Sequence, residues 1–418
     1  MTGETSKITN TPLKIWLINH YAITPQFSGG TRHYDFSRYL AAQNHTVTLW
    51  LCSFLHNKGA YATKSERKEI CASLPANLNL MWLWSSSYQR NNMFRALNMI
   101  FFSIVLLFRG LLVPERPDVI VASSPHLFAC VSGWILAKAK GSRFVLEVRD
   151  LWPESLIAVG ANLNKLVIGT LSYIEVFLYR KSSKIIVVAE GIKSTLIERG
   201  FPSSKIVFIP NGVHLKDVRV SVAKEEMRRR LNLENRFIAM YSGAHAYCYA
   251  LDNVVDAAPF LQDFPNITLV FLGDGSEKKR LIHRSAGMGL TNVAFLDPVP
   301  KHEVPNYLNM ADILILTTQN NAVFQRARPN KLFDYLVSGR PILCSVEGEM
   351  QKVVEESGAG IPVKPQDPFE LAQGIKYMYE HRHQFHKWEN KAQRFVREHC
   401  DREKHAAQLE QLLISIAG

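Results

Sequence analysis

The chain has 418 residues, of which 47% are hydrophobic and 21% are charged, and its formal net charge is +12. This length accommodates two domains with cores of their own, and the composition excludes a disordered or fibrous protein. The positive charge favours an anionic partner, namely a nucleotide, nucleic acid or an acidic membrane surface. The six cysteines form no CxxC pair, which argues against a zinc site or disulfide framework and favours a reducing cytoplasmic compartment.

Predicted strands and helices alternate through the first half of the chain. The polar N-terminal segment, 1–12, has no signal-peptide pattern and is expected to fray. Short apolar runs predict strands at 14–19, 47–51, 79–83, 118–122, 143–148, 184–188 and 205–209. Helical stretches, the first at 31–43, separate most of them. Strands this apolar, spaced by helices, predict a parallel sheet covered on both faces.

The stretch 94–113 is the only candidate membrane segment in this half. Arg95 and Arg109 bracket its uninterrupted apolar core, 99–108, which is shorter than the roughly 20 apolar residues that span a bilayer. The stretch predicts either a helix buried in the domain or a helix lying in the membrane interface with its arginines at the head groups. One helix can satisfy both interpretations at its opposite ends.

A second series of strands follows a charged, helical segment at 216–234. Its strands are predicted at 237–242, 267–272, 293–296, 312–317, 341–345 and 359–363. The tail, 368–417, is predicted to be helical almost throughout. The fold class is therefore α/β, with two doubly wound parallel-sheet domains. The main cleft is expected between them, where the carboxyl ends of the strands meet.

The strongest local signal for a site follows the strand at 312–317. A helix is predicted to begin near Pro329 and to end near Gly339. Three cations stand before it or in its first turn: Arg326, Arg328 and Lys331. Cations beside the unpaired N–H groups of a helix N-terminus predict a phosphate or diphosphate site. Asp334, one turn beyond Lys331, is placed to accept hydrogen bonds from ribose or sugar hydroxyls. An ordinary capped helix with solvated charges explains the same pattern.

Glycine loops follow three predicted strands. They contain Gly29 and Gly30; Gly243, with His245 after it; and Gly273, Asp274 and Gly275. Glycines let a ligand approach the backbone and let loop N–H groups point at an anion. Arg32 and His33 add charge beside the first loop. The first loop is explained equally well as a simple tight turn, and the loop at 273–275 lacks the GxGxxG pattern of a dinucleotide site. One such loop means little, but three at predicted strand ends mean more.

A charged cluster follows the strand at 143–148, formed by Glu147, Arg149, Asp150 and Glu154. Because unpaired buried charges are costly, the cluster is expected to face a cleft, to pair internally, or both. Asp150 and Glu154 are candidate bases or hydroxyl ligands, and Arg149 is a candidate anion ligand. His126, after another strand, is a candidate base, although a lone histidine is more often structural.

Several motifs are absent from the sequence. No two aspartates lie two residues apart, so there is no DxD motif for a metal-bound nucleotide. GxxxxGK[ST], HExxH and GxSxG are also missing, which argues against a P-loop ATPase, a zincin and a serine hydrolase. We therefore expect no metal site.

These segments together resemble the retaining GT-B glycosyltransferases of family 4 over nearly the whole chain. The glycine loop at 29–33, IPNGVH at 209–214 and GDG at 273–275 are similar to general motifs of that family. EVRDLWPES at 147–155 and PNKLFDY at 329–335 resemble, more specifically, the branch with WbuB-like enzymes of surface-polysaccharide synthesis.

The resemblance implies two Rossmann-like domains that face each other across a cleft. Residues 1–215 would hold the acceptor, residues 216–395 the nucleotide-sugar, and residues 396–418 would cross back to the first domain. The implied donor-side residues are Gly243, His245, Gly273, Asp274, Gly275, Val299, Arg326, Arg328, Asn330, Lys331, Leu332 and Asp334. The acceptor-side residues are Gly29, Gly30, Arg32 and His33, and the catalytic candidates are His126, Arg149, Asp150 and Glu154.

The implied reaction is retaining transfer of a sugar from a UDP-sugar to a polyprenyl-diphosphate-linked glycan in O-antigen or capsule synthesis. An N-acetylated hexosamine or a deoxyhexosamine is the expected sugar. Fixed cations and a helix N-terminus would stabilise the departing diphosphate without a metal or other cofactor. The enzyme is expected in the cytoplasm, peripheral to the inner face of the plasma membrane.

Two other functions are kept as alternatives. A UDP-sugar 2-epimerase shares the two-domain architecture but would consume the UDP-sugar without an acceptor. A basic nucleic-acid-binding protein is the distant alternative. The cationic residues are spread through the chain with no recognition motif, so no nucleic-acid partner is expected.

Overall fold

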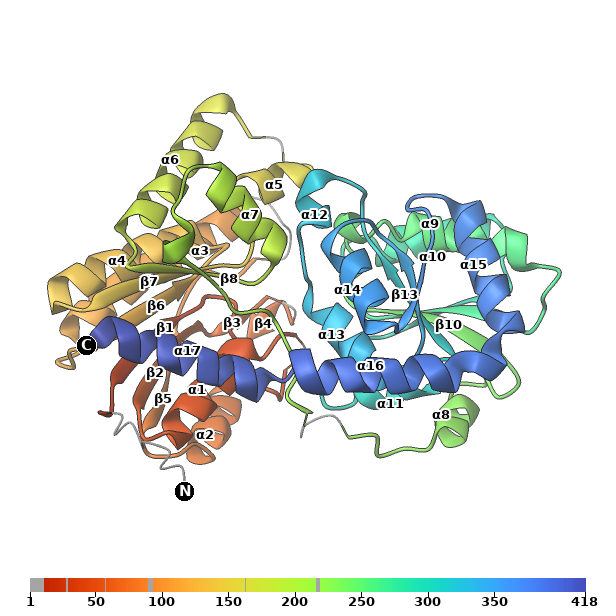
Figure 1. The fold of residues 1–418 in the computed structure, drawn as a ribbon, viewed down its shortest axis with the longest axis horizontal. Helices are drawn as coiled ribbons and strands as arrows, with labels where there is room; N and C mark the ends of the chain where they lie inside the picture. The colour runs from red at the N-terminus through yellow and green to blue at the C-terminus, as the bar shows by residue number, and fades with distance from the viewer. Residues whose placement is uncertain (1–10, 28, 57, 89–92, 162, 216–218) are drawn as a thin grey trace, which may run out of the picture.

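The computed structural model describes residues 11–27, 29–56, 58–88, 93–161, 163–215 and 219–418. Two α/β domains lie side by side. The chain runs from red to green through the first and from green to blue through the second, and its dark blue C-terminal helix returns to the first (Figure 1). Most of the expected frayed N-terminus and the first residues of the helix predicted at 216–234 lie outside the described residues. The two Rossmann-like domains expected for a GT-B fold are confirmed.

The first domain contains a parallel sheet of seven described strands, in the order β5-β2-β1-β6-β7-β8-β9. These are β1 (Lys14–Ile18), β2 (Thr46–Cys52), β5 (Leu78–Leu83), β6 (Val119–Ser123), β7 (Arg143–Val148), β8 (Lys184–Val187) and β9 (Ile206–Phe208). Every predicted strand is present, and its ends lie within one residue of those expected. Apolar side chains alternate between two cores, one on each face of the sheet, as a doubly covered sheet requires.

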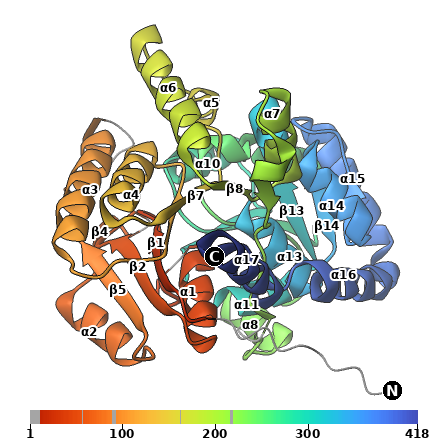
Figure 2. The same ribbon diagram turned by 60° about the vertical axis from the view of Figure 1, so that its left-hand side comes forward.

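Helices cover both faces of this sheet. One face is covered by α3 (Met93–Leu112), α4 (Leu127–Lys140), α6 (Lys165–Lys181) and α7 (Glu190–Glu198), with the short α5 (Glu154–Ala158) near its edge. The other face is covered by α1 (Arg32–Ala42), α2 (Lys64–Ala72) and α17 (Arg402–Ala417). Figure 2 shows α3 and α4 on one side of the strands and α1, α2 and α17 on the other.

A short antiparallel hairpin was missed by the sequence analysis. Its strands, β3 (Phe54–Leu55) and β4 (Ala60–Tyr61), have two residues each and follow β2. Strands this short carry no periodic pattern, so they leave no signal of their own. The hairpin lies at the carboxyl end of the sheet, which is where ligands bind in this kind of fold.

The second domain is built in the same way, on a parallel sheet with the described order β12-β11-β10-β13-β14-β15. The strands are β10 (Phe237–Ser242), β11 (Ile267–Leu272), β12 (Val293–Leu296), β13 (Ile313–Thr317), β14 (Ile342–Ser345) and β15 (Gly360–Pro362). One face is covered by α8 (Lys224–Arg230), α11 (Val304–Met310), α13 (Asn330–Ser338), α14 (Glu349–Ser357) and α16 (Phe385–His399). The other is covered by α9 (Asp252–Ala257), α10 (Lys278–Gly287) and α15 (Pro368–Glu380), and α12 (Ala322–Gln325) precedes α13.

The C-terminal segment crosses from the second domain to the first. The crossing lies between α16 and α17 and runs beside the earlier connection, where the backbone N–H of Val213 donates to the carbonyl of Cys400 at 2.9 Å. Beyond the crossing, Arg402 forms an ion pair with Asp35 of α1. Farther along α17, Glu410 bonds His45 at 3.0 Å. The last helix of the chain is therefore part of the first domain's core.

Candidate active site

A cleft of about 750 Å³ lies between the two domains. From the second domain, its described wall includes Asp274, Pro298, Val299, Pro300 and Asn330. From the first domain, it includes Gly30, Arg149, Asp150, the loop after β1 and the β3–β4 hairpin. The carboxyl ends of both sheets therefore meet at the cleft, as a pair of doubly wound domains predicts.

Lys331 lies in the first turn of α13, directly after the cleft residue Asn330. Its ammonium is 3.3 Å from the ring centroid of Tyr249 and 4.1 Å from that of Tyr241, whose hydroxyl it also bonds. The ammonium makes no ion pair within the part of the chain that is described. Burial lowers the pKa of Lys331 well below that of a free lysine. This is a cation held by aromatic rings and left without a counter-ion.

The loops that follow β10 and β11 pack closely around this lysine. A Cβ on Gly243 would lie 3.0 Å from the ammonium of Lys331, and φ is +141° at Gly243 and +139° at Gly273, so glycine suits both positions. A Cβ on Gly273 would collide with the carbonyl of Gly243. The backbone N–H of His245 donates to the carbonyl of Asp274 at 2.8 Å, which joins the two loops.

His245 is buried in the same loops. Within the described chain, neither of its ring nitrogens has a hydrogen-bond partner. Burial, followed by the nearby Lys278 and Lys331, lowers the pKa of His245 to about 4, so the ring is neutral at physiological pH. A neutral ring with two unused nitrogens fits the expected donor side better than it fits a structural role.

Three predicted donor-side charges are already paired. Asp334 accepts from Lys301 Nζ at 2.6 Å. Arg328 Nε donates to Glu349 at 2.6 Å, so this guanidinium braces α13 against α14 and does not stand free at an anion site. Arg326 lies 3.8 Å from Glu154 of the first domain and therefore links the two domains.

Leu332 also departs from its predicted role, because its side chain is fully buried in the apolar core of the second domain. It positions α13 and does not contact the cleft. Of the predicted donor-side residues, Asp274, Val299 and Asn330 line the cleft directly. Gly243, His245, Gly273, Gly275 and Lys331 lie in the loops and helix turn immediately behind them.

The acceptor-side roles of Arg32 and His33 are corrected by the structure. Both side chains are buried and bond the carboxylate of Glu147, Arg32 Nε at 2.9 Å and His33 Nε2 at 2.6 Å. Burial would raise the pKa of Glu147, but the charges of His33 and Arg32 outweigh it and hold that pKa well below its usual range. These residues form a buried network that fixes α1 to β7. Glu147 therefore has the structural ion-pair role that was the alternative for the charged cluster at 147–154, but its partners come from α1.

Gly30 does line the cleft, and it meets the second domain there. A Cβ at this position would collide with Nδ2 of Asn330. The absence of a side chain therefore lets the glycine loop approach the N-terminus of α13. Gly29, with φ of +132°, supplies the backbone turn that precedes it.

His126 does not fit a catalytic base. Its Nδ1 accepts from the backbone N–H of Ala129 at 2.9 Å and caps α4, and its Nε2 bonds the carbonyl of Met99 at 2.9 Å. Burial lowers the pKa of His126 to about 4. Glu154 does not line the cleft either, and its carboxylate forms an ion pair with Arg199.

Arg149 and Asp150 remain as catalytic candidates in the cleft wall. The carboxylate of Asp150 makes no side-chain hydrogen bond within the described chain. The side chain is accessible to solvent, but both domains enclose it, and this desolvation raises the pKa of Asp150. The second domain lies close by, because Asp150 lines the same cleft as Asp274 and Asn330.

Several cleft residues were missed by the sequence analysis. They lie in the loop after β1, between the strands of the β3–β4 hairpin and at the start of α3, and include His20, Tyr21, His56, Lys58 and Arg95. Arg95 NH2 donates to the hydroxyl of Tyr21 at 2.9 Å. Irregular loops carry no periodic pattern, so the loop residues had no signal in the sequence, whereas Arg95 was considered only as a residue that flanks the apolar stretch of α3. Among the described residues, no group of three or more His, Cys, Asp or Glu side chains could hold a metal ion.

Comparisons with known proteins agree with this architecture. The model for glycosyl transferases group 1 matches residues 223–395, and that for the glycosyl transferase 4-like domain matches residues 29–212. The putative colanic acid biosynthesis glycosyl transferase WcaI of Escherichia coli K12 is 26% identical over 275 residues, 62% of this chain and 66% of WcaI. The probable glycosyltransferase WbjE of Pseudomonas aeruginosa is 22% identical over 285 residues, 67% of this chain and 69% of WbjE.

Among solved structures, Anabaena HepE in complex with UDP-glucose has a TM-score of 0.73 at 16% identity, with 96% of this chain and 100% of that chain covered. The fold and the two family matches define a GT-B glycosyltransferase. The chain belongs to family 4 of these enzymes, as its sequence motifs indicated.

Proposed function

We propose that the enzyme transfers a sugar from a UDP-sugar to a lipid-linked glycan in surface-polysaccharide synthesis, with retention and without a metal. The observation that carries this proposal is the unpaired ammonium of Lys331 behind the N-terminus of α13. The named roles of WcaI in colanic acid synthesis and the UDP-glucose complex of HepE support the polymer class and the nucleotide. An N-acetylated hexosamine or deoxyhexosamine stays the expected sugar.

In this reaction, the negative charge of the departing diphosphate has to be stabilised. Lys331 and the N-terminus of α13, for which no side-chain cap is present among the described residues, supply positive potential there. Asp150, on the opposite domain, orients the acceptor hydroxyl or takes its proton. Attack from the face that the diphosphate leaves gives retention and needs no nucleophile on the protein.

A thermal-shift experiment with UDP tests the donor site. UDP at about 100 times its dissociation constant should add about 2.7 kcal/mol to the free energy of unfolding. The same stabilisation is expected in EDTA, because fixed cations replace a metal in this proposal. ADP and GDP serve as controls for the base. No stabilisation by UDP, or its loss in EDTA, would contradict the proposed donor site.

An assay without acceptor separates the transferase from the 2-epimerase. Incubation with UDP-N-acetylglucosamine alone should return the sugar nucleotide without change at C2, as NMR of the recovered sugar will show. Interconversion of the C2 epimers under these conditions would establish the alternative activity. Addition of a membrane extract that contains lipid-linked glycans should then release UDP.

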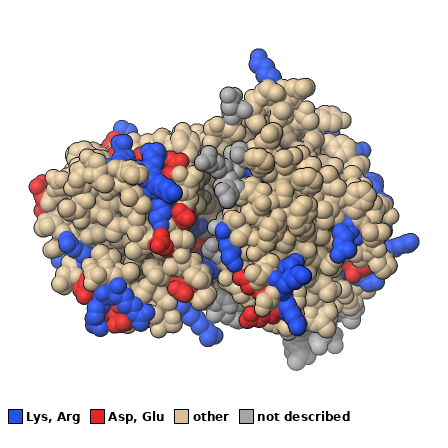
Figure 3. Space-filling view, turned by 180° about the vertical axis from the view of Figure 1, so that it is seen from behind, with Lys and Arg blue, Asp and Glu red and all other residues tan. Residues whose placement is uncertain are grey.

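The exposed face of α3 supports a lipid-linked acceptor. By length and composition α3 could cross a membrane, although one side of it packs against α4. Its other side exposes large apolar residues at helical spacing: Met93, Leu97, Ile100, Phe101, Ile104, Phe108, Leu111 and Leu112. The helix contains no acidic residue. From behind, the lobe of the first domain has a broad area without charged side chains (Figure 3).

Together these features fit a helix that lies in the membrane interface, which was one of the two interpretations of the sequence. The start of α3 also reaches the cleft, because Arg95 lines it. The apolar face and the cleft are therefore joined by one helix. A lipid tail beside α3 would bring its glycan head group to the cleft.

Replacement of Ile104 and Phe108 by aspartate should reduce binding to phosphatidylglycerol vesicles about tenfold or more. These side chains are 45% and 64% exposed, so the change removes apolar contacts with lipid and leaves the core intact. Co-sedimentation with the vesicles measures the effect. Ile282→Asp on α10, where the wild-type residue is 40% exposed, is the matched control. Equal sedimentation of all three proteins would argue against this face.

A further inference from the structure

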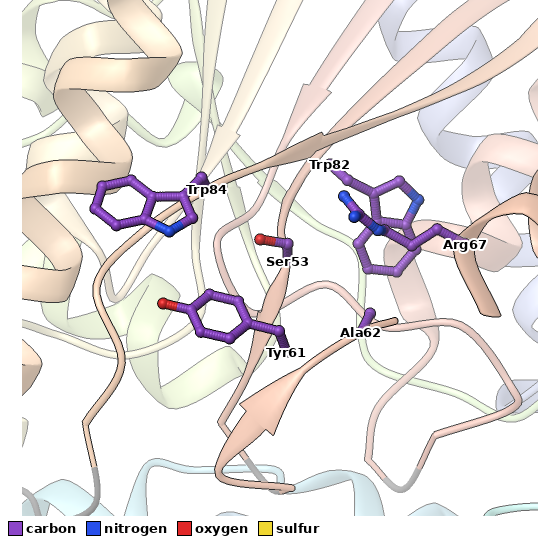
Figure 4. A pocket seen from close by; sticks show the side chains of 6 residues that line it. All are labelled: Ser53, Tyr61, Ala62, Arg67, Trp82 and Trp84. Carbon is purple, nitrogen blue, oxygen red and sulfur yellow. The ribbon is translucent and has the colours of Figure 1, made fainter. Parts of the chain in front are cut away.

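A second hollow, of about 350 Å³, lies at the carboxyl ends of β2 and β5. Its described lining consists of Ser53, Tyr61, Ala62, Arg67, Trp82 and Trp84. Figure 4 shows Trp84 and Tyr61 on one side of the Ser53 hydroxyl and Trp82 and Arg67 on the other. The volume is at the lower end of the range for small-molecule sites, roughly 300–1,000 Å³.

This aromatic pocket and the interdomain cleft share a wall. Cys52 lines the cleft, whereas the next residue, Ser53, lines the pocket. In the same way, Glu66 lines the cleft and Arg67 lines the pocket. Within the β3–β4 hairpin, the ring of Tyr61 contacts that of Phe54, a cleft residue, with centroids 5.3 Å apart. The hairpin and the first turn of α2 thus stand between the two hollows.

The polar groups of the pocket are largely unused. The indole N–H of Trp82 is buried and has no partner among the described residues. Arg67 forms no described ion pair, and its one described hydrogen bond runs from Nε to the carbonyl of Thr63 at 3.4 Å. Trp84 is 55% exposed, although tryptophan is usually largely buried. Tyr61 is held in place, since its hydroxyl donates to the carbonyl of Ser85 at 2.7 Å.

We propose that this pocket binds a sugar ring of the acceptor glycan, beyond the sugar that reacts in the cleft. The C–H bonds on the face of a pyranose carry partial positive charge and pack against the negative faces of aromatic rings. Its hydroxyls can pair with the indole N–H, the guanidinium and the Ser53 hydroxyl. An isoprenoid chain in the same place would leave these groups without hydrogen-bond partners, which is unfavourable. The assignment to the acceptor depends on the proposed function, whereas the assignment to a sugar does not.

Saturation-transfer NMR on the full-length protein, with UDP present in excess, tests the pocket. The probes are glucose, galactose, N-acetylglucosamine, fucose and glucuronic acid, each at millimolar concentration. At least one should receive saturation from the protein, and Trp84→Ala should weaken its binding about tenfold. Arg67→Gln should weaken it as well. Tyr173→Ala, which removes a 73% exposed aromatic from α6, is the matched control and should bind as the wild type does.

Two results would overturn the proposal. One is that no probe gives a signal that depends on Trp84. The other is that Trp84→Ala leaves sugar binding unchanged but reduces binding to phosphatidylglycerol vesicles, which would assign Trp84 to the membrane surface. The thermal shift with UDP is measured on the same variants. Failure of UDP to stabilise the wild type would contradict the donor site alone, while a sugar signal would still support the pocket.

Discussion

Lys331→Met is expected to lower kcat about 100-fold, which is about 2.7 kcal/mol of lost transition-state stabilisation. The ammonium that we assign to the departing diphosphate is removed, while the apolar side chain keeps the space between Tyr241 and Tyr249 filled. The free energy of unfolding of Lys331→Met should not be lower than that of the wild type. Burial lowers the pKa of Lys331, so the unfolded state holds its proton more tightly and the charge opposes folding at neutral pH.

Steady-state kinetics and chemical denaturation at pH 7 measure the two effects separately. Lys224→Met is the informative control, because Lys224 pairs with Asp312 at 2.9 Å and neither residue lines the cleft. That variant should lose some stability through the broken ion pair and change kcat less than threefold. If Lys331→Met kept full activity, or if both variants lost activity equally, the assignment of Lys331 to the diphosphate would be wrong.

Asp150→Asn is expected to lower kcat about 1,000-fold, within the range of roughly 10²–10⁴ typical of a lost acid–base group. Asparagine keeps the shape of the side chain but cannot take a proton from the acceptor hydroxyl. Desolvation between the domains raises the pKa of Asp150, so the carboxylate forms at a higher pH than a free aspartate. Wild-type kcat/KM should therefore be low where Asp150 is protonated, rise with pH through that raised pKa, and level off once the carboxylate has formed.

The matched variant for this test is Glu154→Gln. Glu154 lies four residues away but is occupied by Arg199 and does not line the cleft. We expect Glu154→Gln to retain activity within threefold and to lose activity at low pH as the wild type does. In Asp150→Asn, by contrast, the residual activity should not depend on pH in that range. A larger loss in Glu154→Gln than in Asp150→Asn would reverse the two roles.

The fold was readable from the sequence because its strands are buried on both faces. A run of apolar residues such as 267–272 predicts a buried strand without any knowledge of the rest of the fold, and β11 occupies these residues in the structure. The glycine loops and the start of α13 were placed correctly for a related reason, since backbone geometry at Gly273 or Pro329 depends on local residue types. The two residues per strand of β3 and β4 were too few for such a pattern.

Side-chain partnerships were not readable in the same way. Arg32 and Glu147 are separated by 115 residues, and Asp334 and Lys301 by 33, yet both pairs are in direct contact. Nothing in the local sequence distinguishes a charge that is paired in this manner from one that faces a ligand. Lys331 and Asp150 differ from Arg328 and Glu154 only in the neighbours that the folded chain brings to them.

The return of α17 to the first domain has a consequence for the order in which the protein matures on the ribosome. The first domain's sheet and α1 are synthesised early, but Leu409 and Leu413, which cover them, are synthesised only after the whole second domain. Until α17 has been synthesised, that apolar surface stays uncovered, so the domain that emerges first is completed only after the second domain has been made. Loss of the sixteen residues of α17, 402–417, would therefore destabilise the first domain, although these residues follow the second domain in the chain.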